Sequence, residues 1–190
     1  LAQRLVQMYK HEGESKWEWF ESYLTYGNSV LPEALLCAYR ITNNSVYKEI
    51  AEASFAFLLA QTFDSTGIKV ISNQKWLQKG GQAALYGEQP IDVAYTVLAL
   101  SQFYQVFDRP EYLMKMRIAF NWFLGANHLQ QIIYNPCTGG CYDGLEQYQI
   151  NLNQGAESTV SYLMARLTVD EYKDRMNLLE NSMDGVAFPV

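Results

Sequence analysis

The sequence predicts an all-α fold built from repeated helical hairpins. Three observations support this prediction. Apolar residues in the long segments recur at helical spacing and not in the alternation of a half-buried strand. Segments that are apolar nearly all round are followed, after a short turn, by segments with one charged side. The apolar segments begin at Leu31, Ile91 and Ala156, so the pattern repeats after 60 and then 65 residues.

The first hairpin is predicted from two adjoining helical patterns. A helix over 30–41 follows Asn28 or Ser29, either of which is a favourable N-cap residue. A second helix begins after Asn44-Ser45, and its charged residues fall on one side while its apolar residues fall on the other. The first helix is therefore expected to be the inner member of the pair, and the second the outer member.

Two further buried helices are predicted at 91–107 and 156–167. The helix at 91–107 has almost no charged side, and Pro90 suits its first turn. Its amphipathic partner is predicted from Glu111 to Leu124. The charged segment 170–175 is expected to open the partner of the last buried helix.

Hairpins repeated in this way curve into a solenoid or close into a toroid, because each hairpin buries its inner face against its neighbours. Residues 1–190 are therefore expected to form a single domain, an α/α toroid or an open half of one, in which 1–12 supplies an additional outer helix. The return loops, 64–89 and 125–154, are long enough to suggest function, and short strands are expected in them at 69–71 and 131–134.

Composition excludes several classes of protein. Fourteen Lys and Arg against twenty Asp and Glu leave a formal charge of -6, which disfavours nucleic acid as a partner. The longest apolar run, 55–60, is far shorter than the roughly 20 residues of a membrane-spanning helix. The chain opens on an amphipathic segment and not on a signal peptide, so a cytoplasmic location is expected.

The cysteines predict neither a disulfide scaffold nor a metal centre. Cys37, Cys137 and Cys141 cannot all pair within one chain. The spacing Cys137-x3-Cys141 suits zinc, but His11 and His128 are the only histidines, and no second cysteine pair completes a tetrahedral site. We expect no metal and no cofactor.

Polar residues cluster directly before each buried helix, which predicts that they line one rim of the repeat. Four of them are carboxylates that suit general acid and base chemistry on a glycosidic bond: Glu21, Asp92, Asp143 and Glu157. A structural interpretation stands beside this one. Asp92 and Glu157 fall in first turns, where they complement the helix dipole, and Asn28 and Asn153 suit helix caps.

Aromatic and amide residues near these carboxylates suit stacking and hydrogen bonding with a sugar. The candidate substrate-binding residues are Trp19, Tyr26, Asn28, Glu88, Gln89, Tyr142, Asn153 and Gln154. The alternative for the tryptophans is packing, since aromatic residues at helical spacing are mostly part of a core. It applies to Trp17, Trp19 and Trp122.

A set of motifs between Trp17 and Leu167 resembles bacterial proteins of the six-hairpin glycosidase superfamily, in particular helical domains found beside or fused to glycosyltransferases. The motifs are Trp19-Phe20-Glu21, Leu24-Thr25-Tyr26, Glu88-Gln89-Pro90-Ile91-Asp92, Thr138-Gly139-Gly140-Cys141-Tyr142-Asp143-Gly144 and Asn153-Gln154-Gly155-Ala156-Glu157-Ser158. A complete toroid of that superfamily has six hairpins, and this chain has about three. The chain is therefore expected to be the C-terminal half of a longer toroid or a reduced, open version.

The resemblance implies a carbohydrate-active protein of the glycoside hydrolase type. It implies an inverting mechanism, with Asp92 and Glu157 as the acid and base and with Glu21 and Asp143 in reserve. The alternative is a non-catalytic helical module that binds a saccharide or a protein partner and accompanies a glycosyltransferase. The expected partners are thus a carbohydrate, and a glycosyltransferase domain or a missing N-terminal half.

Overall fold

The computed structural model describes residues 1–184 and contains six α-helices and three two-stranded antiparallel ladders within them. The helices are α1 (Ala2–Glu12), α2 (Val30–Thr42), α3 (Ser45–Thr62), α4 (Pro90–Phe107), α5 (Pro110–Asn121), extended by a 3₁₀ turn (Trp122–Leu124), and α6 (Ala156–Asp184). The strands pair as β1 (Tyr23–Leu24) with β4 (Leu77–Gln78), β2 (Phe63–Asp64) with β3 (Gly67–Ile68), and β5 (Gly144–Leu145) with β6 (Ile150–Asn151).

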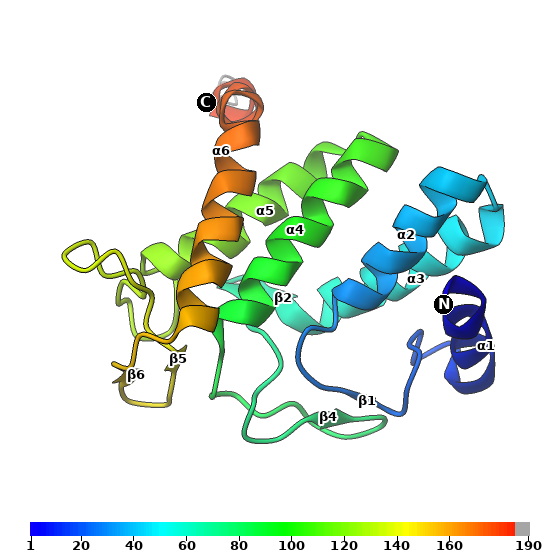
Figure 1. The fold of residues 1–190 in the computed structure, drawn as a ribbon, viewed down its shortest axis with the longest axis horizontal. Coiled ribbons are helices and arrows are strands. Elements are labelled where there is room, and N and C mark those ends of the chain that lie inside the picture. Colours follow the sequence, from blue (N-terminus) through cyan, green and yellow to red (C-terminus); the bar gives the residue numbers. More distant parts are fainter. Residues whose placement is uncertain (185–190) are drawn as a thin grey trace, which may run out of the picture.

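The helices form two layers, as the sequence predicts for an α/α toroid. In Figure 1, α2, α4 and α6 form the front layer, and α3 and α5 lie behind them. Contacts run along the front layer from α2 to α4 to α6 and across the layers from α2 to α3 and from α4 to α5. The N-termini of the front helices all lie at the lower side of this view, beside every strand. We call this side, with its loops, the rim.

Local sequence explains where the helices of each hairpin stop and start. Asn43 follows α2 and Asp108 follows α4. Both residues adopt the left-handed conformation that terminates a helix (φ 53° and 51°). Asn44 then caps α3 by accepting a hydrogen bond from the amide of Val46, while Pro110 opens α5. The turns of the first two predicted hairpins are thus confirmed.

The third hairpin does not form within the described residues, which corrects the expectation for 170–175. That segment continues α6 as one helix of 29 residues, because it contains no Gly or Pro and its apolar side remains packed. Tyr172 is buried and its hydroxyl accepts a hydrogen bond of 2.7 Å from Gln105 of α4. The opposite side of α6 exposes an apolar stripe made of Val160, Leu163, Met164 and Leu167.

The two predicted loop strands are also wrong. Residues 69–71 and 131–133 have no ladder partner in the structure, although Val70, Ile71 and Ile133 are buried. These residues are apolar because they pack individually beneath the rim, which requires no strand pairing. Only Tyr134 takes part in pairing, through an isolated bridge to Cys141.

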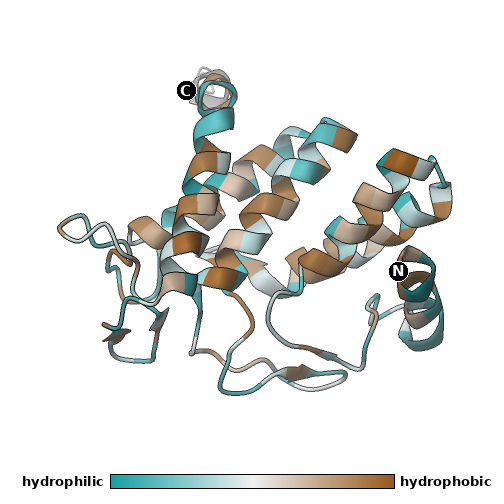
Figure 2. Cartoon of the chain, viewed as in Figure 1, coloured by the Kyte–Doolittle hydropathy of each residue, from teal (hydrophilic) through white to brown (hydrophobic). Residues whose placement is uncertain are grey.

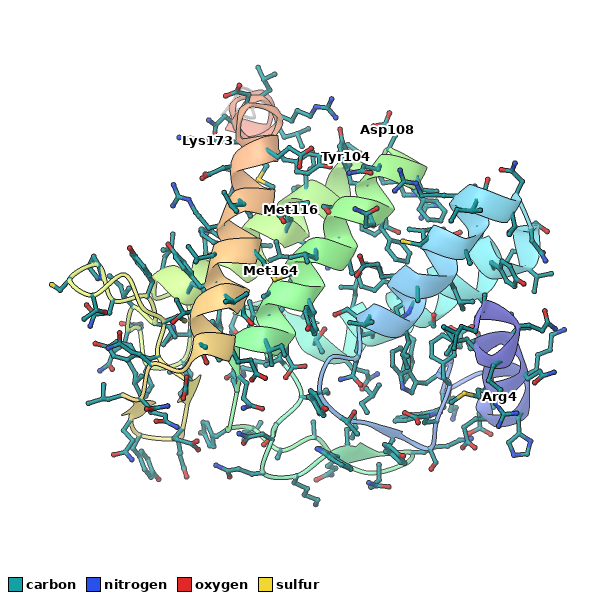
Figure 3. All side chains as sticks on the ribbon, in the orientation of Figure 1. Arg4, Tyr104, Asp108, Met116, Met164 and Lys173 are labelled. Atoms are coloured by element: carbon teal, nitrogen blue, oxygen red, sulfur yellow. The ribbon has the colours of Figure 1, made fainter. Side chains whose placement is uncertain are left out.

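Aromatic rings fill the space between the layers. Phe55 of α3 and Phe103 of α4 have ring centroids 4.1 Å apart, and both are fully buried. In Figure 3, Met116 lies between α5 and α4, while Tyr104 and Asp108 mark the end of α4 remote from the rim. Figure 2 shows that the hydrophobic colour concentrates on the helices and that the rim loops are mostly teal or pale.

Trp17, Trp19 and Trp122 belong to this core, as the structural interpretation predicts, with exposed fractions of 5%, 0% and 0%. Trp19 stacks edge-on against Phe20 at 5.1 Å. The expectation that Trp19 contacts a substrate is therefore corrected, because its ring has no surface open to a ligand.

None of the helices from 1 to 184 combines the length and apolar character needed to cross a bilayer. In the same residues, no group of three or more His, Cys, Asp and Glu side chains is arranged to hold a metal ion.

Candidate functional site

A polar cleft opens on the rim where the start of α6 meets the loop before α4. We call it the rim cleft; its volume is about 270 Å³. Three of its lining residues, Gln89, Asp143 and Glu157, are candidates from the sequence. The others are Asn73, Gly144, Glu146, Asn151, Gly155, Ala156 and Ser158.

Asp143 lines the cleft and binds polar groups at the start of α6. Its Oδ1 accepts hydrogen bonds from the amide of Gly155 at 2.8 Å and from Ser158 Oγ at 2.6 Å, and its Oδ2 accepts one from Asn153 Nδ2. Desolvation acts to raise the pKa of Asp143, but these three donors outweigh it and hold the pKa below its usual range. A Cβ at position 155 would lie 2.9 Å from this carboxylate, so only glycine permits the approach.

Glu157 presents its carboxylate to the cleft. It lies in the first turn of α6, where the helix dipole favours a negative charge, and its side chain is exposed. Asp143 binds the same helix end, so the two predicted carboxylates line one small cavity together with Gln89 and Glu146. The structure thus brings together the acidic residues of two predicted motifs.

Asp92 lies beneath this surface and is only 5% exposed. Its Oδ1 accepts a hydrogen bond of 2.6 Å from the amide of Gly27, which ties the loop before α2 to the first turn of α4. Its Oδ2 is buried without a hydrogen-bond partner and borders a small cavity lined by Asn28, Ser29 and Thr96. Burial, helped by the nearby charge of Glu157 and opposed by the hydrogen bond from the Gly27 amide, raises the pKa of Asp92 to about 7.

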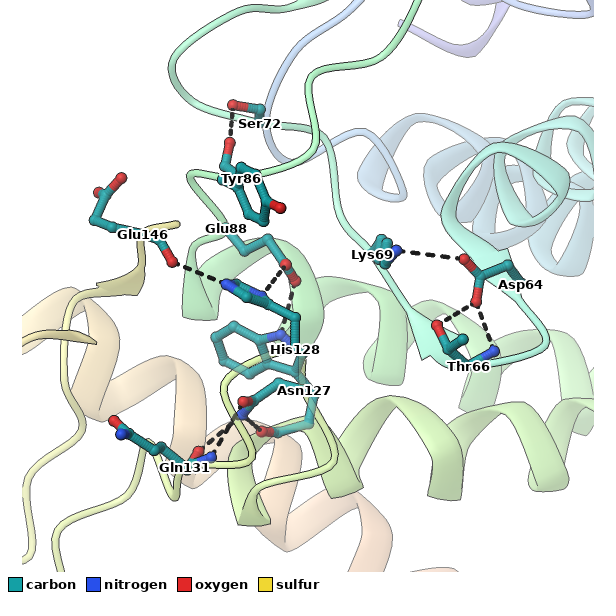
Figure 4. Close-up of polar contacts among 11 residues, drawn as sticks. Asp64, Thr66, Lys69, Ser72, Tyr86, Glu88, Asn127, His128, Gln131 and Glu146 are labelled. Carbon is teal, nitrogen blue, oxygen red and sulfur yellow. Dashed lines mark hydrogen bonds and ion pairs between the residues drawn. The ribbon is translucent and has the colours of Figure 1, made fainter. Parts of the chain in front are cut away.

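Glu88 is buried on the other side of the same loop, at 3% exposure. Trp122 Nε1 donates to its Oε2 at 2.8 Å, and His128 Nδ1 lies 3.4 Å from its Oε1 (Figure 4). Burial raises the pKa of Glu88, and the contacts with Trp122 and His128 act in the opposite direction. Glu88 therefore reaches the core and a histidine, not the rim cleft.

His128 joins two walls of the site. Its Nε2 lies 2.9 Å from the carbonyl oxygen of Glu146, which lines the rim cleft, while its Nδ1 faces Glu88. Glu88 and Leu145 also exchange two main-chain hydrogen bonds, in which the amide of each residue donates to the carbonyl of the other. A second cavity of about 640 Å³, bordered by Lys69, Glu88 and His128, lies on the far side of the bridge.

The remaining predicted residues lie outside the rim cleft. Glu21 borders none of its surface, and its carbonyl accepts the indole N–H of Trp17. Tyr26 is exposed. Asn28 does not cap α2; its side chain bonds both backbone groups of Thr25 and closes the loop.

Three other predicted residues, Asn153, Gln154 and Tyr142, make hydrogen bonds next to the cleft without lining it. Asn153 does not cap α6 directly and instead donates to Asp143. Gln154 accepts a hydrogen bond of 2.5 Å from Thr138. The hydroxyl of Tyr142 accepts a bond from Asn135 Nδ2 at 3.1 Å.

Sequence reasoning missed Asn73, Glu146 and Asn151. Each lies in a return loop, away from the helix starts on which the prediction concentrated. A weak signal exists for Asn151 in the amide-rich run 151–154, but nothing local distinguishes Asn73, because it reaches the cleft through the fold of the loop after α3.

No family model matches this sequence, and no curated protein matches it. Among solved structures, the chain is similar over its whole length to an α-1,6-mannanase, GH76A of Salegentibacter sp. HEL1_6, determined as an inactive variant in complex with α-1,6-mannotriose. The TM-score is 0.61 and the sequence identity is 15%. The match covers 100% of this chain and 59% of the mannanase, so this chain spans about three-fifths of that enzyme's length. The arrangement of its helices is thus that of an α/α toroid.

Proposed function

We propose that this protein binds a neutral oligosaccharide in the rim cleft. The observation that carries the proposal is the convergence of Gln89, Asp143 and Glu157 on one polar cavity at the N-terminal side of the front helices. Carboxylate and amide groups suit a sugar, whose hydroxyls both donate and accept hydrogen bonds. The structural likeness to a mannanase that binds α-1,6-mannotriose supports a carbohydrate ligand.

The acidic residues of the rim cleft determine which class of saccharide it favours. Glu146 lines the cleft together with Asp143 and Glu157, and the whole chain has a formal charge of -6. A phosphorylated or carboxylated sugar would meet like charges at close range. A neutral glycan meets carboxylate acceptors for its hydroxyl protons and amide donors for its hydroxyl oxygens, so the cleft favours it.

Hydrolysis is a second candidate function, and one observation favours it. A pKa of about 7 suits Asp92 to protonate a leaving oxygen near neutral pH, while Glu157 would be the base that activates water. An inverting reaction of this kind requires roughly 6.5–9.5 Å between the two carboxyls. It also requires the loop at Gly27 to move, since Asp92 is covered in this conformation.

The hydrogen bonds of the carboxylates favour binding over hydrolysis. Asp92 is engaged by Gly27, and Asp143 is engaged by three donors that fix the start of α6. Glu157 is left as the exposed carboxylate of the predicted pair. One exposed carboxylate suits ligand recognition, whereas acid and base catalysis needs two that reach the substrate. The motif resemblance further supports a module that accompanies a glycosyltransferase.

The test combines a glycan array of neutral oligosaccharides with calorimetry on α-1,6-mannotriose. Glu157→Gln and Gln89→Ala should each weaken saccharide binding by about three- to tenfold, as expected for the loss of one hydrogen bond of about 1 kcal/mol. Glu171→Gln is the matched control, because Glu171 is an exposed glutamate of α6 at the end remote from the rim.

Product analysis of the same incubations separates the two candidates. Binding without release of shorter sugars supports the module. Release of sugar that Asp92→Asn abolishes supports hydrolysis. Absence of binding to every neutral glycan on the array contradicts the proposal.

A further inference from the structure

A pair of aromatic rings lies open to solvent on the rim, outside the cleft. Tyr23 belongs to β1, and Trp76 directly precedes β4, which pairs with β1. Their ring centroids are 5.9 Å apart and their planes differ by 22°, so the rings are nearly parallel. Trp76 is 46% exposed. We call these two residues the aromatic platform.

This exposure sets Trp76 apart from the other tryptophans. All four lie in the part of the chain that the structure describes, and the other three are 0–5% exposed. Tyr23 stacks against one face of the indole, so the opposite face is the one left to receive a ligand. Large rings kept at the surface are costly in water and are commonly retained for binding.

Packing of the ladder does not explain the platform. The pairing of β1 with β4 is anchored by Leu24 and Leu77, which lie opposite one another and are 0% and 4% exposed. The amide of Lys79 also donates to the carbonyl of Ser22 at 2.8 Å, which extends the ladder. The two buried leucines and these backbone bonds hold the strands together, so the ladder does not depend on Trp76.

The platform is joined to the rim cleft by a short segment of chain. Asn73 lines the cleft, and Gln74 Nε2 donates to Glu146 Oε2 of the cleft wall at 2.5 Å. Trp76 follows Asn73 by three residues, a backbone span of at most about 11 Å. A ligand that fills the cleft and continues along this segment therefore meets the indole.

We infer that Trp76, supported by Tyr23, is a stacking subsite that binds a sugar ring of an oligosaccharide whose other end occupies the rim cleft. The apolar C–H face of a pyranose ring packs against an aromatic face. Hydrogen-bonding side chains cannot provide this contact. This inference rests on the proposed function and adds to it that the ligand is extended. Short saccharides would fill the cleft alone.

The experiment compares α-1,6-mannobiose with α-1,6-mannohexaose on the full chain. Acrylamide quenching of intrinsic fluorescence reports mainly on Trp76, because the other three tryptophans are buried. Mannohexaose should protect this fluorescence from quenching, and mannobiose should not. Trp76→Ala should weaken mannohexaose binding by about three- to tenfold and leave mannobiose binding unchanged, as expected for the loss of one ring contact.

Two further variants make the result specific. Trp76→Tyr, which keeps an aromatic face, should restore most of the affinity for mannohexaose. Leu85→Ala removes another exposed apolar side chain of the same loop, 63% exposed, and should change neither affinity. A purely structural role would instead appear as a lower melting temperature of Trp76→Ala with no selective loss of the longer sugar.

The outcomes separate this inference from the proposal on which it rests. If the wild-type protein binds both sugars and Trp76→Ala binds mannohexaose equally well, the platform is not a subsite, and the rim cleft stands. If the wild-type protein binds neither sugar, both the subsite and the cleft are contradicted for this glycan class.

Discussion

His128 Nδ1 lies 3.4 Å from Glu88 Oε1, while His128 Nε2 lies 2.9 Å from a carbonyl oxygen of Glu146. A carbonyl only accepts, so Nε2 must carry a hydrogen in this arrangement. The contact of Nδ1 with the Glu88 carboxyl is attractive only when the two groups share one further proton, and it joins the loop before α4 to the loop that forms the cleft wall.

We predict that His128→Gln makes stability more sensitive to pH. Burial already raises the pKa of Glu88, and removal of the histidine charge raises it further. A carboxyl with a raised folded-state pKa contributes stability at low pH that is lost as pH rises, because the unfolded state releases its proton first. Urea unfolding should therefore show a steeper loss of stability between pH 5 and 8 in the variant.

His11→Gln is the control for that measurement. His11 is the other histidine of the chain and lies exposed in the last turn of α1. Its removal should leave the pH profile of the wild-type protein unchanged. Parallel profiles for His128→Gln and wild type would contradict the shared proton.

We predict that Asp92→Asn stabilises the protein at high pH. The folded-state pKa of about 7 exceeds the usual value of 3.8, so ionisation of Asp92 lowers the free energy of unfolding as pH rises through that interval. Asparagine keeps an acceptor for the Gly27 amide and never ionises. In urea unfolding the variant should match wild type at about pH 3, below both pKa values, and exceed it at pH 8 by on the order of 2–4 kcal/mol.

Asp92→Ala should instead be less stable than Asp92→Asn at every pH. It leaves the amide of Gly27 without its acceptor, and an unmet donor of this kind costs about 1–3 kcal/mol. Equal stability of the alanine and asparagine variants would show that the bond to Gly27 contributes nothing.

We predict that Asp143→Ala loosens the start of α6. The variant removes the acceptor of the Gly155 amide and of the Ser158 hydroxyl, and the loss of a helix cap costs about 1 kcal/mol. Hydrogen exchange should become faster at the amides of 155–158 and stay unchanged in α5. Protected amides at 155–158 in the variant would show that the helix start is held by other contacts.

We predict that the two loop cysteines react at very different rates. Cys137 is exposed, whereas Cys141 is fully buried and burial raises the pKa of its thiol to about 12. Iodoacetamide should label Cys137 in the native protein and reach Cys141 only after unfolding. Cys141→Ser should fold normally in the presence of a chelator, and stoichiometric zinc lost on that substitution would overturn our view that the cysteines bind no metal.

The helices were predictable because their signals are local. Pro90, Asn44 and Asp108 act on the backbone beside them, and apolar spacing reports which side of a helix is buried. The expected break at 170–175 failed because a charged segment suits the exposed side of a continuing helix as well as the start of a new one. The strand predicted at 69–71 does not form, and the prediction was wrong because burial and strand pairing favour the same residue types, here Val70 and Ile71.

The candidate site was predictable in part for the same reason. Glu157 lies in the first turn of a helix that the local sequence predicts, whereas Asp143 precedes β5 and reaches the start of that helix across the β5–β6 ladder. The partnership of Glu88 with Trp122 joins positions 34 residues apart, and no periodicity encodes it. The exposure of Trp76 could not be predicted from the sequence, because the residue lies in a loop and helical spacing reports burial only within helices.

The residues proposed to contact a ligand are separate from those that hold the two layers together. Glu157, Gln89 and Trp76 project from the rim, whereas the ring contact of Phe55 with Phe103 joins the helices. Substitutions at the rim can therefore accumulate without removing core contacts. Such a division lets a lineage exchange one glycan preference for another while every intermediate sequence still folds.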